Sequence, residues 1–143
     1  MSDRLDGTVA LVTGASSGIG AATAVALAAQ GAAVAIAARR TDRLDALAKQ
    51  IRGQGGTALV LASDIANEQQ ATDAVERTVA EFGRLDTLVN NAGVMLLGPA
   101  VDAPLAEWQK MSSSTCSVCC IAPMQRCRIS CARRKTALDA WPT

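Results

Sequence analysis

The segment Thr13–Gly20, which reads Thr-Gly-Ala-Ser-Ser-Gly-Ile-Gly, constrains the fold of this chain more than any other part of its sequence. It follows an apolar run, Gly7–Thr13, and precedes an Ala-rich run, so it joins a predicted buried strand to a predicted helix. Gly14 permits a tight turn after the strand, and Gly18 and Gly20 allow a close ligand approach and close helix packing. Unpaired N–H groups at a helix start bind anions, so the segment predicts a pyrophosphate-binding turn rather than a bare structural one.

Apolar runs and amphipathic runs alternate along the chain as far as Gly93. The sequence predicts further strands at 33–38, 57–62 and 85–89 and helices at 18–30, 41–54 and 67–82, with Asn67 as an N-cap and Gly31 and Gly83 as stops. Such alternation indicates βαβ units around a parallel sheet. We expect a Rossmann-type, doubly wound α/β fold of about four strands in the order 3-2-1-4, which is incomplete. The predicted domain covers 1–111, in which a helix begins at Pro104, and an irregular tail covers 112–143.

The composition argues against several classes of partner. The 143 residues carry 14 basic and 13 acidic side chains, a net charge of +1 that gives no electrostatic reason to expect nucleic acid or an acidic membrane surface. The polar start of the chain lacks the apolar core of a secretory signal, and no apolar run is long enough to cross a bilayer. We therefore expect a cytoplasmic protein without a membrane partner.

Three motifs in this order resemble the short-chain dehydrogenase/reductase family. They are the glycine-rich segment, Asp64-Ile65 after the third predicted strand, and Asn90-Asn91-Ala92-Gly93 after the fourth. The resemblance covers roughly Met1 to Met111, and it implies that Asp64 meets the adenine ring and that the Asn-Asn-Ala-Gly segment lies beside the cofactor. The predicted cofactor-binding residues are Gly14, Ser16, Ser17, Gly18, Ile19, Gly20, Arg39, Arg40, Asp64, Ile65, Asn91, Ala92 and Gly93.

The end of the second strand bears on the choice between NAD(H) and NADP(H). An acidic side chain there accepts the ribose 2′-OH of NAD, whereas a basic one pairs with the 2′-phosphate of NADP. This chain has Ala38 in the acidic position, followed by Arg39 and Arg40, and a guanidinium suits a phosphate. The sequence favours NADP(H) over NAD(H); the alternative is a pair of solvated arginines on a loop.

The resemblance also implies a Tyr-x-x-x-Lys pair in which Tyr exchanges the substrate proton and Lys lowers the Tyr pKa. The chain has no Tyr and no His, and we assign no catalytic residue and no substrate. Restoring one nucleotide after the Met111 codon can convert Ser112–Val118 into Val-Gln-Phe-Asn-Val-Leu-Gly, which looks like the family's next helix. A frameshift at that codon is therefore our hypothesis for the tail.

All five cysteines lie between Cys116 and Cys131. Their thiols could in principle bind zinc, but the spacing matches no defined zinc motif and an odd number does not suit a disulfide framework. We expect incidental thiols and assign no metal site.

Three functions fit the sequence. The first is an oxidoreductase of this family, which in full-length relatives transfers hydride between a carbonyl or alcohol and NADP(H), with catalysis impaired here. The second is a non-catalytic dinucleotide-binding fragment or the product of a disrupted gene, and the third is a Cys-rich metal or interaction module on a partial Rossmann unit. A dinucleotide is the expected ligand. The resemblance implies that full-length relatives can form homo-oligomers, and it leaves the oligomeric state of this chain open.

Overall fold

A computed structural model describes residues 4–93, 105–106 and 109. Its core is a four-stranded parallel sheet in the order β3-β2-β1-β4, which confirms the predicted topology. The strands are β1 (Val9–Thr13), β2 (Ala33–Ala38), β3 (Thr57–Ala62) and β4 (Thr87–Val89). The predicted helix that begins at Pro104 is described only at three helical residues, and the tail with its cysteines lies outside the described part of the chain.

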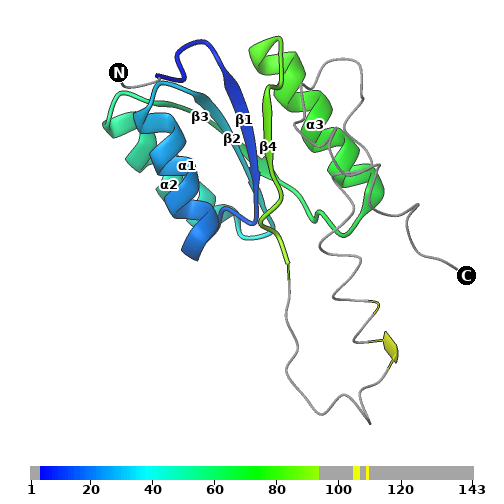
Figure 1. Ribbon diagram of the computed structural model, residues 1–143. Helices are drawn as coiled ribbons and strands as arrows, with labels where there is room; N and C mark the ends of the chain where they lie inside the picture. Colours follow the sequence, from blue (N-terminus) through cyan, green and yellow to red (C-terminus); the bar gives the residue numbers. More distant parts are fainter. Residues whose placement is uncertain (1–3, 94–104, 107–108, 110–143) are drawn as a thin grey trace, which may run out of the picture.

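Three helices cover the two faces of the sheet. Helices α1 (Gly18–Ala29) and α2 (Thr41–Gly53) lie together on one face, and α3 (Glu68–Phe82) lies on the other (Figure 1). The fold is therefore doubly wound, as the sequence predicts. None of the described helices combines the length and apolar character that a bilayer crossing requires.

Strand side chains alternate between two hydrophobic cores. Val12 and Ile36 pack under α1 and α2, whereas their neighbours Leu11 and Ala35 pack under α3. All four are fully buried, because each face of a parallel sheet is covered by helices. This alternation explains why the strands read as continuous apolar runs in the sequence.

Two strands begin two residues later than the sequence predicts, β1 after a turn at Asp6-Gly7 and β4 after Leu85-Asp86. Gly7 has a positive φ of 77°, and β1 starts at Val9, whose N–H donates to the Asp86 carboxylate at 2.9 Å. Leu85 is buried but precedes β4. A single Asp therefore joins the beginnings of two neighbouring strands, which hydrophobicity patterns alone do not reveal.

Candidate functional site

The topology places a cleft at the carboxyl ends of the strands. From β1 the chain crosses to β2 on one side, whereas β4 pairs with the other side of β1, so the connections diverge at this point. A cleft of about 820 Å³ opens there. It is lined by Gly14, Ser16, Ser17, Gly18, Ile19, Ala38, Arg39, Arg40, Ser63, Asp64, Ile65, Ala66, Asn91, Ala92 and Gly93.

Three positions of the turn require glycine for different structural reasons. Gly14 has φ +65°, and a Cβ there would lie 2.8 Å from Ala92 Cα. A Cβ on Gly20 would overlap the Asn91 side chain and lie 2.6 Å from the Gly14 carbonyl oxygen. Gly18 also needs its left-handed φ of +60°, but a Cβ there would meet nothing within 4 Å. Gly14 and Gly20 thus serve internal packing, and Gly18 faces open space in the cleft.

Helix α1 begins beside this open space without a side-chain cap. Ser17 is its N-cap residue and makes no capping hydrogen bond, and the first turn carries no acidic side chain. The first-turn N–H groups of a helix have no partner within the helix and carry partial positive charge. The cradle at Gly18 therefore suits an anionic group such as a pyrophosphate.

A buried hydroxyl connects the glycine-rich turn to the end of β4. Thr13 Oγ1 accepts the N–H groups of Asn91 and Ala92, both at 3.1 Å, and donates to the Val89 carbonyl at 3.3 Å. Thr13 is fully buried. One hydroxyl thereby satisfies two backbone donors that would otherwise be costly to bury.

The side chain of Asn91 strengthens the same connection. Its Nδ2 donates to the carbonyl oxygens of Thr13 and Gly14, both at 3.2 Å. The predicted role beside the cofactor is therefore joined by a structural one, because the amide fixes the backbone from which the cradle starts.

Two adjacent arginines follow β2 and behave differently. The Arg40 guanidinium donates through Nη2 to Ser16 Oγ at 3.1 Å and Ser17 Oγ at 3.2 Å, which links the end of β2 to the glycine-rich turn. Arg39 also lines the cleft and is exposed, and among the described residues it makes no hydrogen bond or ion pair. The residue before them, at the end of β2, is the buried Ala38, so this position carries no acidic group.

On the far side of the cleft, Asp64 and Ile65 follow β3. Asp64 Oδ1 accepts the N–H of Ala66 at 3.1 Å, and the Asp64 N–H donates to Gln70 Oε1 at 2.8 Å. Ile65 is buried, whereas Ile19, at the start of α1, is 78% exposed. The cleft thus combines basic, acidic and apolar groups at separate places.

The structure brings every predicted site residue to this cleft or directly beneath it, since only Gly20 packs below the turn. Sequence reasoning missed Thr13 as a connecting residue and Gln70 as a partner of Asp64. A polar residue ending an apolar strand is a signal for the first. The spacing Asn67-x-x-Gln70 resembles a capping box, which would pair Gln70 with the Asn67 N–H, so it does not indicate the second.

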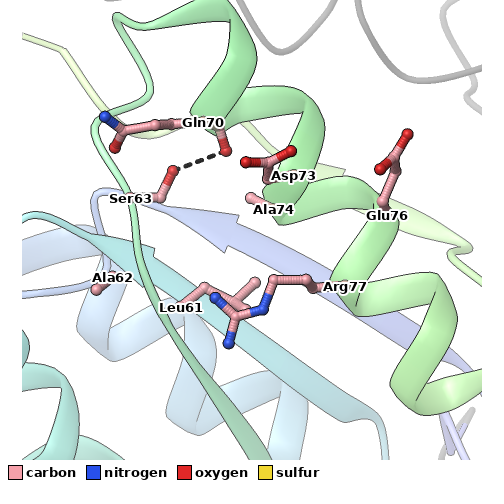
Figure 2. Close-up of a pocket in the computed structure, with 8 residues that line it drawn as sticks. All are labelled: Leu61, Ala62, Ser63, Gln70, Asp73, Ala74, Glu76 and Arg77. Atoms are coloured by element: carbon pink, nitrogen blue, oxygen red, sulfur yellow. Dashed lines mark hydrogen bonds between the residues drawn. The ribbon is translucent and has the colours of Figure 1, made fainter.

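A second, smaller pocket of about 180 Å³ lies between β3 and α3, where Ser63 Oγ donates to the Gln70 carbonyl oxygen at 3.0 Å (Figure 2). Its lining is Leu61, Ala62, Ser63, Gln70, Asp73, Ala74, Glu76 and Arg77. It contains neither the glycine-rich turn nor Arg39 and Arg40, so we place the candidate site in the larger cleft.

Comparison with known proteins identifies a matching family. The family model for short chain dehydrogenases matches residues 8–125. The chain is 48% identical over 105 residues to D-threitol dehydrogenase of Mycolicibacterium smegmatis, which covers 73% of this chain and 40% of the relative. The chain thus spans about two fifths of the length of this curated relative.

Solved structures have the same fold. A short chain dehydrogenase from Burkholderia cenocepacia in complex with NADP is 39% identical, with a TM-score of 0.78 over 84% of this chain and 49% of that one. A 7α-hydroxysteroid dehydrogenase complexed with NADH and 7-oxo glycochenodeoxycholic acid is 33% identical, with a TM-score of 0.75 over 78% and 43% of the two chains. Both kinds of nicotinamide cofactor therefore occur among its structural neighbours.

Proposed function

The chain belongs to the short-chain dehydrogenase family, and from this we propose that its cleft binds NADP(H) as the cofactor-binding half of an oxidoreductase. When bound, the nicotinamide would supply hydride exchange with a carbonyl or alcohol group. The uncapped start of α1 at the open Gly18 cradle is the observation that carries the proposal. The fifteen residues that line the cleft would hold the dinucleotide; Asp64 and Ile65 would border its adenine end and Asn91–Gly93 the nicotinamide side.

The preference for NADP(H) rests on the end of β2. Arg39 is an exposed cation at the cleft with no partner among residues 4–93, so its guanidinium is available to a 2′-phosphate. Arg40 would support the cradle through Ser16 and Ser17. Ala38 leaves the NAD-specific acidic position without a carboxylate.

Calorimetric titration of NADP⁺ and NAD⁺ tests the preference. Arg39→Ala should weaken NADP⁺ binding by about tenfold or more, since hydrogen bonds to charged groups contribute roughly 1.5–3 kcal/mol, and should change NAD⁺ binding little. Arg40→Ala should weaken the binding of both cofactors. The matched control is Arg43→Ala, because Arg43 is exposed on α2 but does not line the cleft. Tighter binding of NAD⁺ to the unmutated chain would overturn the preference.

We further propose that these 143 residues by themselves bind cofactor without efficient turnover. The sequence contains no Tyr and no His, so neither a phenol nor an imidazole is present to exchange the substrate proton. The test is to mix the protein with NADPH and each ketone of a panel and to follow the absorbance of NADPH over time. Steady oxidation of NADPH would refute the proposed lack of turnover.

The division at residue 111 and the frameshift are proposals of the same kind. Ser and Cys cluster from Ser112 onward, whereas the first 115 residues hold no cysteine. The family match reaches residue 125, so the gene should be sequenced from codon 105 through the region downstream of codon 143. Failure of a one-base restoration to open a frame encoding Tyr-x-x-x-Lys would reject the frameshift.

A further inference from the structure

The connection from β3 to α3 is tied to one glutamine by three hydrogen bonds. The Gln70 N–H donates to Asn67 Oδ1 at 3.1 Å, and Gln70 Oε1 accepts the Asp64 N–H at 2.8 Å. The Gln70 carbonyl oxygen also accepts from Ser63 Oγ at 3.0 Å (Figure 2). Main-chain and side-chain atoms of Gln70 thus contact both ends of the loop that carries Asp64.

The side chain of Gln70 departs from the usual pattern at a helix start. In a capping box, the side chain at this third position would accept the N–H of the N-cap residue. Here the Asn67 N–H donates to the Asp64 carbonyl oxygen at 2.9 Å, and Asn67 caps α3 with its own side chain. The Gln70 carboxamide is therefore not required by the cap, and it holds Asp64 instead.

Only one oxygen of the Asp64 carboxylate is bound within the described part of the loop. Oδ1 accepts the Ala66 N–H, whereas Oδ2 makes no hydrogen bond with the residues in 4–93. Asp64 lines the cleft and is half-buried. With its backbone N–H held by Gln70, the carboxylate presents Oδ2 as an acceptor in a defined place, which suits an exocyclic amino group of a base.

We propose that Gln70 is a positioning residue for the adenine end of the bound dinucleotide and acts through Asp64. The inference rests on the proposed cofactor binding. Gln70 is exposed and carries no charge, so its contribution comes from the hydrogen bond to Asp64 rather than from burial or electrostatics.

Two dinucleotides test this role: NADP⁺, and its analogue in which hypoxanthine replaces adenine and a carbonyl replaces the 6-amino group. Calorimetry on the full chain should show that the unmutated protein prefers NADP⁺. Gln70→Met removes the acceptor and should reduce that preference about two- to fivefold, the size expected for one hydrogen bond. Gln70→Glu keeps an oxygen acceptor and should restore most of the preference.

Gln69→Met is the matched control, because the exposed Gln69 donates to Asp73 on α3 and makes no hydrogen bond to Asp64. It should leave the preference unchanged. A preference unaltered by Gln70→Met, or absent from the unmutated protein, would overturn the role of Gln70 while leaving cofactor binding intact. If the unmutated chain binds neither dinucleotide, the proposed function itself fails. Urea unfolding of each variant verifies that the compared proteins are folded.

Discussion

The two ends of the parallel sheet use polar groups in opposite ways. At the amino ends of the strands, polar groups satisfy one another: Asp86 accepts from Val9 and Arg84, and the Leu5 N–H donates to the Gln30 carbonyl. At the carboxyl ends, the Gly18 cradle, the start of α1 and Arg39 face a cleft. The same kinds of group therefore stabilise the fold at one end and remain available to a ligand at the other.

Glycines give the most direct comparison, because each end has at least one glycine with a positive φ and no neighbour near the missing side chain. Gly7 has φ +77° at the amino end, and Gly18 has φ +60° at the carboxyl end. Gly14 shares this conformation but packs against the Ala92 backbone. Replacing glycine by alanine at these three positions therefore separates the effects of backbone strain, packing and ligand access.

The largest effect is expected for Gly14→Ala. Strain at positive φ and the clash with Ala92 should together lower the free energy of unfolding by about 3 kcal/mol or more. Urea denaturation followed by circular dichroism measures this loss. If Gly14→Ala were no more destabilised than Gly7→Ala, the packing role of Gly14 would be wrong.

Thr13→Val should have the next largest effect. The valine leaves the N–H groups of Asn91 and Ala92 without their acceptor inside the protein, which should cost about 2 kcal/mol of stability. Thr13→Ser keeps the hydroxyl and is the control in the same denaturation experiment. Equal stability of the valine and serine variants would contradict the connecting role.

Gly18→Ala and Gly7→Ala sharpen the comparison between the ends. Each should lose about 1 kcal/mol of stability from strain alone, because each added methyl group meets open space. Only Gly18→Ala should weaken NADP⁺ binding, by about tenfold, since its methyl group fills the cradle. Calorimetry and denaturation of both variants separate the two effects, and an equal loss of affinity would remove Gly18 from the site.

The smallest effect concerns pH at the amino end. The Arg84 hydrogen bond, and after it the Val9 N–H, hold the pKa of Asp86 below its ordinary value of 3.8. Because the folded-state pKa is lowered, this stabilisation is present above the ordinary pKa and is lost as pH falls through the lower folded value. The contribution should stay below about 1 kcal/mol, since water screens the exposed Arg84.

Asp86→Asn should remove that part of the acid dependence. Urea unfolding at about pH 7 and about pH 3 should show a smaller difference for the variant than for the unmutated chain. A larger loss of unfolding free energy at low pH in Asp86→Asn than in the unmutated chain would contradict the lowered pKa of Asp86. Cofactor affinity at neutral pH should stay unchanged, because Asp86 lies at the end of the sheet opposite the cleft.

The sequence by itself determined the order and type of the elements and most of the cleft. Apolar runs, amphipathic spacing and glycine stops act within one element, so Asn67 and Gly83 could be placed at the two ends of α3 without a structure. Because parallel strands bring their carboxyl ends together, residues after all four strands could also be assigned to one site.

Only the tertiary structure decided which side chains meet across that site. Arg40 reaches Ser16 and Ser17, and Thr13 joins Asn91, through contacts between residues more than 20 positions apart. Even the short-range bond between Gln70 and Asp64 depended on the path of the loop, since a capping-box spacing by itself would favour the Asn67 N–H as the partner of Gln70. Local patterns determine which elements form, whereas a side-chain hydrogen bond requires distances and directions that exist only after those elements pack together.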